Sequence, residues 1–227
     1  MNKRKAWAVA KINFRFLLPA YIITAILIII GAWNLIASLT GITGNYYVEM
    51  GSYLYALCVF APIFIAGYNF KRIMHLNGKK SGYYLGCLAN YVIIAAGASL
   101  LNLVLLSTSK SLFHFRLVIQ SLPEVFGWLE HGVFAAFFQQ FFFLLLISVF
   151  IHTLTEMQCF WFGWTADIIL VAIISVFIPI PLLRNILVGF FNLIIFHQNA
   201  MVQIFCCLIL SISFYALDLL VLGRKRI

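Results

Sequence analysis

Charged residues divide the chain into long uncharged stretches, and this alternation is its dominant pattern. Uncharged stretches of 33, 21 and 29 residues follow Arg15, Glu49 and Lys80, and another 33 residues separate Arg184 from Asp218. An apolar helix of about 20 residues is long enough to cross the hydrocarbon core of a bilayer. The pattern therefore predicts several membrane-spanning helices with their limits set by charged residues.

We expect an all-α integral membrane protein that forms a single transmembrane domain over residues 1–227. The uncharged stretches predict six transmembrane helices, at 17–39, 53–70, 83–106, 131–152, 161–180 and 200–222. The last stretch is too long for one span, because 33 helical residues would reach about 50 Å. Pro179 and Pro181 end the fifth helix, so we expect a short re-entrant helix over 183–196 before the last span.

The composition agrees with this pattern and excludes other classes. Hydrophobic residues make up 64% of the chain, charged residues only 9%, and the mean hydropathy is +1.06. A soluble domain needs more polar surface than this, and neither disordered proteins nor outer-membrane barrels show such long apolar stretches. The net charge of +9 lies at the ends of the apolar stretches, which indicates membrane topology and no nucleic-acid partner.

The positive charges also predict the orientation. Of the 15 Lys and Arg residues, 12 fall in the N-terminal stretch, the 71–82 loop and the C-terminal tail. Because cytoplasmic segments are enriched in Lys and Arg, both termini are expected in the cytoplasm. Residues 1–16 are interpreted as an interfacial amphipathic helix, with its apolar side chains in the acyl boundary: Trp7, Ile12, Phe14 and Phe16.

No catalytic motif is present in the sequence, so an enzyme is not expected. The residues around Gly78 and Lys79 lack the leading glycine of a phosphate-binding loop. His152 and Glu156 are four residues apart and share a helix face, with Asp167 further along, but no H-E-x-x-H motif occurs. A metal or protease site is one interpretation, and a polar cluster at the cytoplasmic mouth of two helices is the simpler one. The five cysteines show no C-x-x-C spacing, and no metal is expected.

The second cytoplasmic loop carries the most informative segment. Residues 70–90 read FKRIMHLNGKKSGYYLGCLAN. On a helix, Phe70, Ile73 and Met74 form an apolar stripe. Lys71, Arg72 and His75 form a basic stripe beside it. Asn77 and Gly78 predict a turn, and Gly82, Gly86 and Asn90 place small or polar residues on one helix face, as in a packing seam. A short amphipathic helix, a turn and a tightly packed span suit a docking element.

This segment resembles the coupling-helix region of ABC-2 type exporter permeases, and the topology of the whole chain is similar to theirs. The resemblance implies that the segment docks on a separate ATPase subunit that binds ATP and Mg, so this chain has no cofactor of its own. The implied coupling residues are Phe70, Lys71, Arg72, His75, Asn77, Gly78, Lys79 and Lys80. It further implies a bacterial cytoplasmic membrane, two ATPase subunits and a second permease copy, most simply as a homodimer.

The compact size is similar to the membrane subunits that export amphipathic peptides such as phenol-soluble modulins. Candidate residues of the substrate path are Phe134, Phe138, Gln139, Phe141 and Asp167. Many aromatic and few charged residues within the spans favour amphipathic or apolar cargo, because a desolvated ionic substrate would lack partners. Gln139 has a second interpretation as an inter-helical hydrogen-bonding residue, and Asp167 a second one as a side chain that reaches water.

An alternative function is that of the small-solute-binding membrane component of an energy-coupling-factor importer, which is similarly small and basic. Those components bind their scaffold through small residues on the faces of the spans. A basic docking helix instead suits direct contact with an ATPase, so the 70–82 loop distinguishes the two functions.

Overall fold

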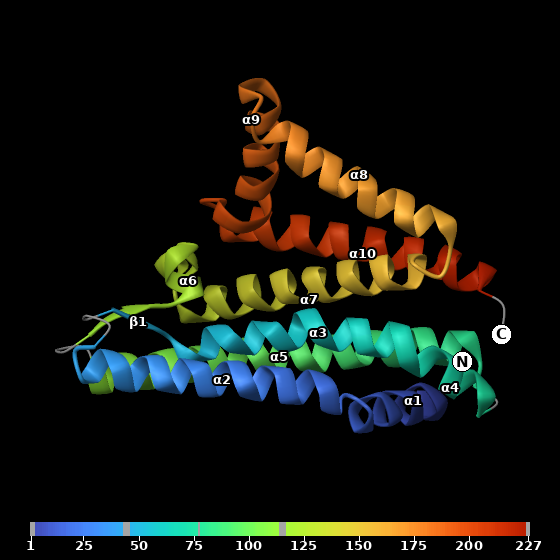
Figure 1. Ribbon diagram of the computed structural model, residues 1–227, viewed down its shortest axis with the longest axis horizontal. Coiled ribbons are helices and arrows are strands. Elements are labelled where there is room, and N and C mark those ends of the chain that lie inside the picture. Colours follow the sequence, from blue (N-terminus) through green and yellow to red (C-terminus); the bar gives the residue numbers. More distant parts are fainter. Residues whose placement is uncertain (1–2, 43–45, 77, 114–116, 226–227) are drawn as a thin grey trace.

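The computed structural model describes residues 3–42, 46–76, 78–113 and 117–225. Within these ranges the structure is almost entirely helical, with one small two-stranded sheet. Most of the long helices run lengthwise through the molecule (Figure 1). The prediction of an all-α protein is confirmed.

Five segments of the described chain are long and apolar enough to cross a membrane. They are α2 (Leu18–Leu39), the continuous segment Met50–His75, α5 (Lys80–Phe113), α7 (Val133–Met157) and α10 (Ala200–Arg224). This confirms a multi-pass membrane protein. Helix α5 extends beyond the predicted third span, 83–106, at both ends. A helix can continue past the bilayer core, which sets only the minimum length of a span.

The segment Met50–His75 changes helix type along its length. It consists of η1 (Met50–Leu54), α3 (Tyr55–Phe64), a π-helical turn η2 (Ile65–Asn69) and α4 (Phe70–His75). Pro62 lies inside α3 and has no N–H, so the carbonyl of Cys58 loses its usual partner. Ser148 of α7 donates to that carbonyl over 3.0 Å. This bond lets the irregular helix stay inside the bundle.

The chain bends sharply between α8 (Trp161–Phe177) and the pair formed by α9 (Pro181–Phe191) and the π-helical η4 (Asn192–Phe196). The direction of the helix axis changes by 117° between the two parts. A break near Pro179 and Pro181 is thus confirmed. Among the residues of α8 only Gly163 is buried, and a Cβ there would lie 2.2 Å from the Met157 carbonyl oxygen. Glycine is therefore required where α8 turns back from α7.

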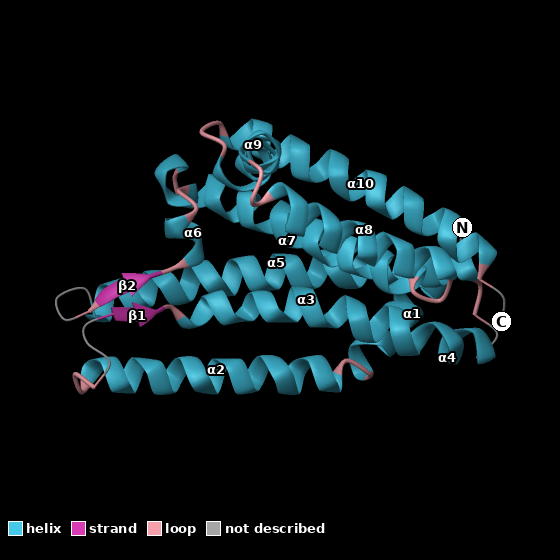
Figure 2. Cartoon of the chain, turned by 45° about the horizontal axis from the view of Figure 1, so that its top comes forward, coloured by secondary structure: helices cyan, strands magenta, loops and turns pink. Residues whose placement is uncertain are grey.

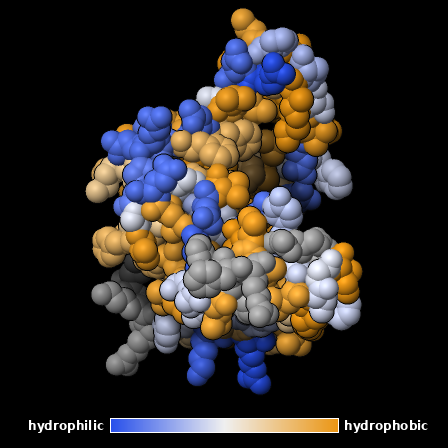
Figure 3. Space-filling model, turned by 90° about the vertical axis from the view of Figure 1, so that its left-hand side faces the viewer, coloured by the Kyte–Doolittle hydropathy of each residue, from blue (hydrophilic) through white to orange (hydrophobic). Residues whose placement is uncertain are grey.

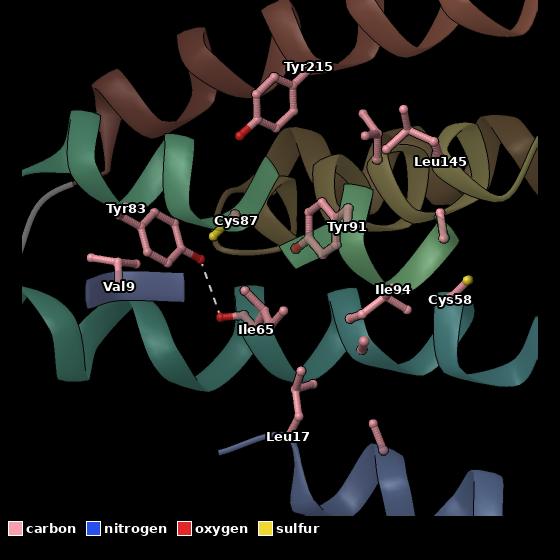
Figure 4. Close-up of a cluster of buried hydrophobic side chains, with 14 of the residues drawn as sticks. Val9, Leu17, Cys58, Ile65, Tyr83, Cys87, Tyr91, Ile94, Leu145 and Tyr215 are labelled. Carbon is pink, nitrogen blue, oxygen red and sulfur yellow. Dashed lines mark hydrogen bonds between the residues drawn. The ribbon is translucent and has the colours of Figure 1, made fainter. Parts of the chain in front are cut away.

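Helix α7 lies in the middle of the molecule, between α10 on one side and α3 and α5 on the other (Figures 1 and 2). The largest buried cluster fills the space between these helices and includes Tyr83, Tyr91 and Leu145 (Figure 4). The Tyr83 hydroxyl reaches across to within 3.3 Å of the Ile65 carbonyl oxygen of η2. In a membrane such close packing and inter-helical hydrogen bonds supply most of the association energy.

The helix α1 (Lys3–Arg15) packs along α5. A Cβ on Gly86 would meet Val9 Cγ1 at 2.6 Å, so the glycine lets the two helices approach. Asn90 donates to the Ala10 carbonyl and accepts from Asn13, both over 3.1 Å. The packing seam predicted on α5 is confirmed at Gly86 and Asn90, whereas a Cβ on Gly82 would meet nothing within 4 Å.

The predicted environment of the N-terminal helix is partly wrong. Trp7 is 61% exposed and Phe16 is exposed too, as an interfacial helix requires, but Ile12 and Phe14 pack against the protein core. The helix therefore turns one apolar face to α5, which the sequence of residues 1–16 alone could not distinguish from a lipid-facing one.

The end of the molecule opposite the termini carries the sheet. Strand β1 (Tyr46–Val48) pairs in parallel with β2 (Val118–Gln120), followed by α6 (Leu122–Val125) and η3 (Trp128–His131). Trp128 donates to the Ile195 carbonyl of η4 over 2.8 Å. We call this end the sheet end, and the end with α1, α4 and the last turn of α10 the terminal end (Figure 1).

Candidate functional site

The short helix α4 presents a basic face outward at the terminal end. Phe70, Ile73 and Met74 are buried in the bundle, while Lys71, Arg72 and His75 are exposed. The amphipathic arrangement predicted for this helix is confirmed. It arises because the helix period of 3.6 puts positions 70, 73 and 74 on one side.

The turn after α4 is tight and leads into another exposed cation. The Gly78 amide donates to the Ile73 carbonyl over 3.0 Å, and a Cβ on Gly78 would lie 2.6 Å from that oxygen. A side chain at this position would therefore clash with the preceding helix. Lys79 is exposed, and Asn77 lies outside the described residues.

Lys80 does not share this exposed position. Its Nζ donates to the carbonyls of Leu222, Gly223 and Lys225 over 3.0, 3.3 and 2.6 Å. These groups end α10, where unpaired carbonyls and the helix dipole favour a cation. Lys80 thus joins the start of α5 to the end of α10, and only the other lysines of the loop are available to a partner.

A buried ion pair lies directly behind α4. Lys225 Nζ is 2.5 Å from Glu156 Oε2, and the side chains are 9% and 0% exposed. Tyr83 donates to the other carboxylate oxygen over 2.9 Å. Lys225 Nζ also lies 4.3 Å from the centre of the Phe70 ring, which packs edge-on against Tyr83. The apolar face of α4 is therefore fixed to α5, α7 and α10 through one ionic cluster.

A second buried polar cluster lies one helical turn deeper. His152 Nδ1 is 2.6 Å from the Tyr91 hydroxyl, and His152 Nε2 is 3.3 Å from Asp218 Oδ2. His152 and Asp218 are fully buried. The angle between His152 Nε2 and Asp218 Oδ2 does not meet the geometry of a hydrogen bond. An ion pair or hydrogen-bonded cluster of this kind is costly within a membrane unless each member has a partner. The two clusters together connect α5, α7 and α10.

The outward basic face of α4 has no acidic partner within the described part of the chain. The ion pairs found there do not include Lys71, Arg72 or Lys79. Arg72 lies 3.9 Å from the centre of the Phe16 ring, which follows α1. This cation–π contact holds α4 against α1 but leaves the charge of Arg72 without an anionic partner. This surface can therefore attract a partner with negative charge.

The candidate residues of the substrate path occupy several environments. Gln139 is buried and donates to Gln203 of α10 over 2.5 Å, which is the inter-helical bond of the second interpretation. Phe134 is 78% exposed near the sheet end, and Phe138 and Phe141 are half-buried along α7. Asp167 of α8 accepts a hydrogen bond from Gln158 and makes none of the contacts found within the two clusters.

Viewed from the sheet end, the region of α9 stands above the rest of the molecule, and hydrophobic side chains line the hollow beside it (Figure 3). The irregular η4 that follows α9 has partners for its carbonyls. Gln203 donates to Ile194 over 3.1 Å, in addition to the bond from Trp128 to Ile195. Non-helical backbone at membrane depth needs such partners.

The sequence indicated some members of the clusters but not their pairing. His152 and Glu156 were expected to share a face of one helix, and both are buried on α7. Asp167, expected near them, does not join them. In the sequence, Lys225 is only one of the tail charges, and Asp218 only marks the end of the last uncharged stretch. Each pairs with a residue some 70 positions away, which no local spacing reveals.

Comparison of the chain with family models, with curated proteins and with solved structures gives no match. Among the described residues, no group of three or more His, Cys, Asp or Glu side chains is placed to hold a metal ion. The fold and the terminal end define the chain as an all-helical, multi-pass membrane protein with an exposed basic helix at one end.

Proposed function

We propose that this chain is the membrane permease subunit of an ABC exporter and that a separate ATPase subunit supplies the energy. The observation that carries the proposal is the basic helix α4, with Lys71, Arg72 and His75 exposed and its apolar face fixed in the bundle. A rigid helix that presents unpaired charge can dock on a complementary protein surface. Such a contact would pass a displacement of α4 into the spans.

The route for that displacement is the ionic cluster behind α4. Phe70 touches both Tyr83 of α5 and Lys225, and Lys225 pairs with Glu156 of α7. A movement of α4 would change packing on three helices at once, because the four buried side chains of the cluster contact one another. Coupling of ATP hydrolysis to the path requires a connection of this type.

The topology of the proposal has six spans. Helix α8 is the fifth, α9 with η4 forms a re-entrant element, and α10 is the sixth. Hydrogen bonds from Trp128 and Gln203 to η4 carbonyls support this arrangement. The terminal end lies in the cytoplasm of a bacterial cell, because 12 of the 15 Lys and Arg residues belong to segments at this end.

The docking helix is tested by co-purification of the ATPase with the membrane subunit. The variant Lys71→Ala, Arg72→Ala, His75→Ala and Lys79→Ala should insert normally but lose the ATPase, because the attracting charges are removed. The matched control is Lys11→Ala with Arg15→Ala, which removes exposed charge from α1 at the same end. Undiminished ATPase binding and stimulation in the four-residue variant would contradict the proposal.

The proposed cargo is an amphipathic peptide that moves along the aromatic residues of α7. Phe134 packs edge-on against Phe138, and the aromatic contacts continue from Phe138 to Phe142. Amphipathic peptides should stimulate the ATPase more than small hydrophilic solutes do. A photo-crosslinker at Phe138 should capture the peptide, whereas one at the buried Gln139 should not. Stimulation by hydrophilic solutes alone would refute the cargo class.

A further inference from the structure

A buried carboxyl group lies at the sheet end, far from the docking helix. Glu49 directly precedes η1, and its side chain is 0% exposed. Neither carboxylate oxygen accepts a hydrogen bond of normal geometry. The ion pairs within the described ranges do not include it. A carboxylate buried in this way is costly, so its state needs an explanation.

A second acceptor faces the same small space. The position that a Cβ on Gly51 would take lies 2.2 Å from Asn102 Oδ1 and 2.8 Å from Glu49 Oε2. Asn102 is fully buried, and its Oδ1 has no hydrogen-bond partner among the described residues. Gly51 leaves the space between α5 and the start of η1 that brings the two oxygens near each other.

The other amide atom of Asn102 fixes the direction of this oxygen. Asn102 Nδ2 donates to the Tyr55 hydroxyl and to Gln140 Oε1, each over 3.1 Å. With both donor bonds directed to α3 and α7, Oδ1 is left in the space beside Gly51 that Glu49 Oε2 also borders. The amides of Gly51 and Ser52 offset only part of the cost of burying the Glu49 carboxylate. Asn102 Oδ1 adds a second acceptor beside it, and a proton on the carboxyl group would satisfy that acceptor.

A proton is the smallest ligand that satisfies both oxygens. An alkaline-earth cation takes about six or more oxygen ligands. The side-chain oxygens that the described residues are shown to bring to this space are fewer: the Glu49 carboxylate, Asn102 Oδ1 and the Tyr55 hydroxyl. The titratable groups near Glu49 are the neutral phenols of Tyr47 and Tyr55. No Lys, Arg or His side chain within the described residues pairs with it.

We propose that Glu49 is a proton-binding site at the sheet end of the protein, with the neutral carboxyl donating its O–H to Asn102 Oδ1. Binding adds one proton to the carboxylate, and release leaves an anion that needs water or new donors. Loss of the proton therefore loosens the contact between η1 and α5. Burial raises the pKa of Glu49, and the amides of Gly51 and Ser52 lower it by less. The site does not depend on the docking of α4.

The test is infrared spectroscopy of the purified full chain in lipid nanodiscs at about pH 6, where an ordinary carboxyl is ionised. We expect a protonated carboxyl band that Glu49→Gln removes and that the matched variant Glu124→Gln leaves unchanged. Glu124 is half-exposed and paired with Lys110. Titration of the band should place the pKa of Glu49 above that of an ordinary glutamate.

Asn102→Leu provides a second readout that keeps the carboxyl in place. The band should move to the frequency of a carboxyl without a hydrogen bond, because the acceptor is gone. Absence of a Glu49-dependent band would overturn the proposal, since the Asn102 amide would then be a donor to a carboxylate. A band that disappears when sodium chloride replaces choline chloride would assign the site to a metal cation and overturn the proton assignment.

Discussion

At the residue scale, the pair of Lys225 and Glu156 is expected to matter most for stability. Removal of one partner by Lys225→Met leaves the Glu156 carboxylate buried and unpaired, which should cost about 3 kcal/mol. The double variant Lys225→Met with Glu156→Gln should recover most of this loss. The measurement is equilibrium unfolding of the purified protein in mixed micelles.

The control for this prediction is the exposed pair of Lys110 and Glu124, whose side chains are 41% and 45% exposed. Lys110→Met should cost less than about 1 kcal/mol, because water solvates the remaining carboxylate. If Lys225→Met and Lys110→Met lowered the free energy of unfolding equally, the burial of Glu156 would not raise the cost of removing its partner.

A second prediction at this scale concerns the pH dependence of stability. Because burial raises the pKa of Glu49 above its ordinary value of 4.5, the folded state binds the proton more tightly than the unfolded state. The resulting stabilisation is complete below pH 4.5 and is lost as the pH rises through the folded pKa. The melting temperature of the wild type should therefore fall more over this pH window than that of Glu49→Gln. Identical profiles would argue against the raised pKa.

At the element scale, the packing of α1 on α5 depends on one glycine of the seam. Gly86→Ala places a methyl group 2.6 Å from Val9 Cγ1 and 3.1 Å from the Ala6 carbonyl oxygen, so α1 must move away. We expect a loss of about 1–3 kcal/mol, as for overpacking, and faster proteolysis of α1. Gly82→Ala on the same helix meets nothing within 4 Å and should be neutral or stabilising by up to about 1 kcal/mol. Equal effects of the two substitutions would mean that α1 is not held by this seam.

At the scale of the whole molecule, the exposed helices indicate an assembly. Only Gly163 of α8 is buried, and α2 buries only 22% of its apolar window. The proposed permease function requires a second copy to enclose a path, so we predict two copies of this chain with two ATPase subunits. Native mass measurement in detergent should give this ratio. A stable single copy with one ATPase would refute it.

The sequence by itself determined the class of protein and the amphipathic character of α4. Long uncharged stretches require a bilayer, and the spacing of Phe70, Ile73 and Met74 requires one buried helix face. Both are local properties, because a helix makes its backbone bonds within itself. The seam at Gly86 and Asn90 was equally visible, since small residues four apart always share a helix face.

Only the tertiary structure decided which polar residues meet. The pairs of Lys225 with Glu156 and of His152 with Asp218, and the approach of Glu49 to Asn102, join separate helices. The partner of α1 and the parallel pairing of β1 with β2 were undetermined for the same reason. Such contacts depend on the relative positions of whole helices, which hydrophobic periodicity leaves free because lipid and protein interior are equally apolar.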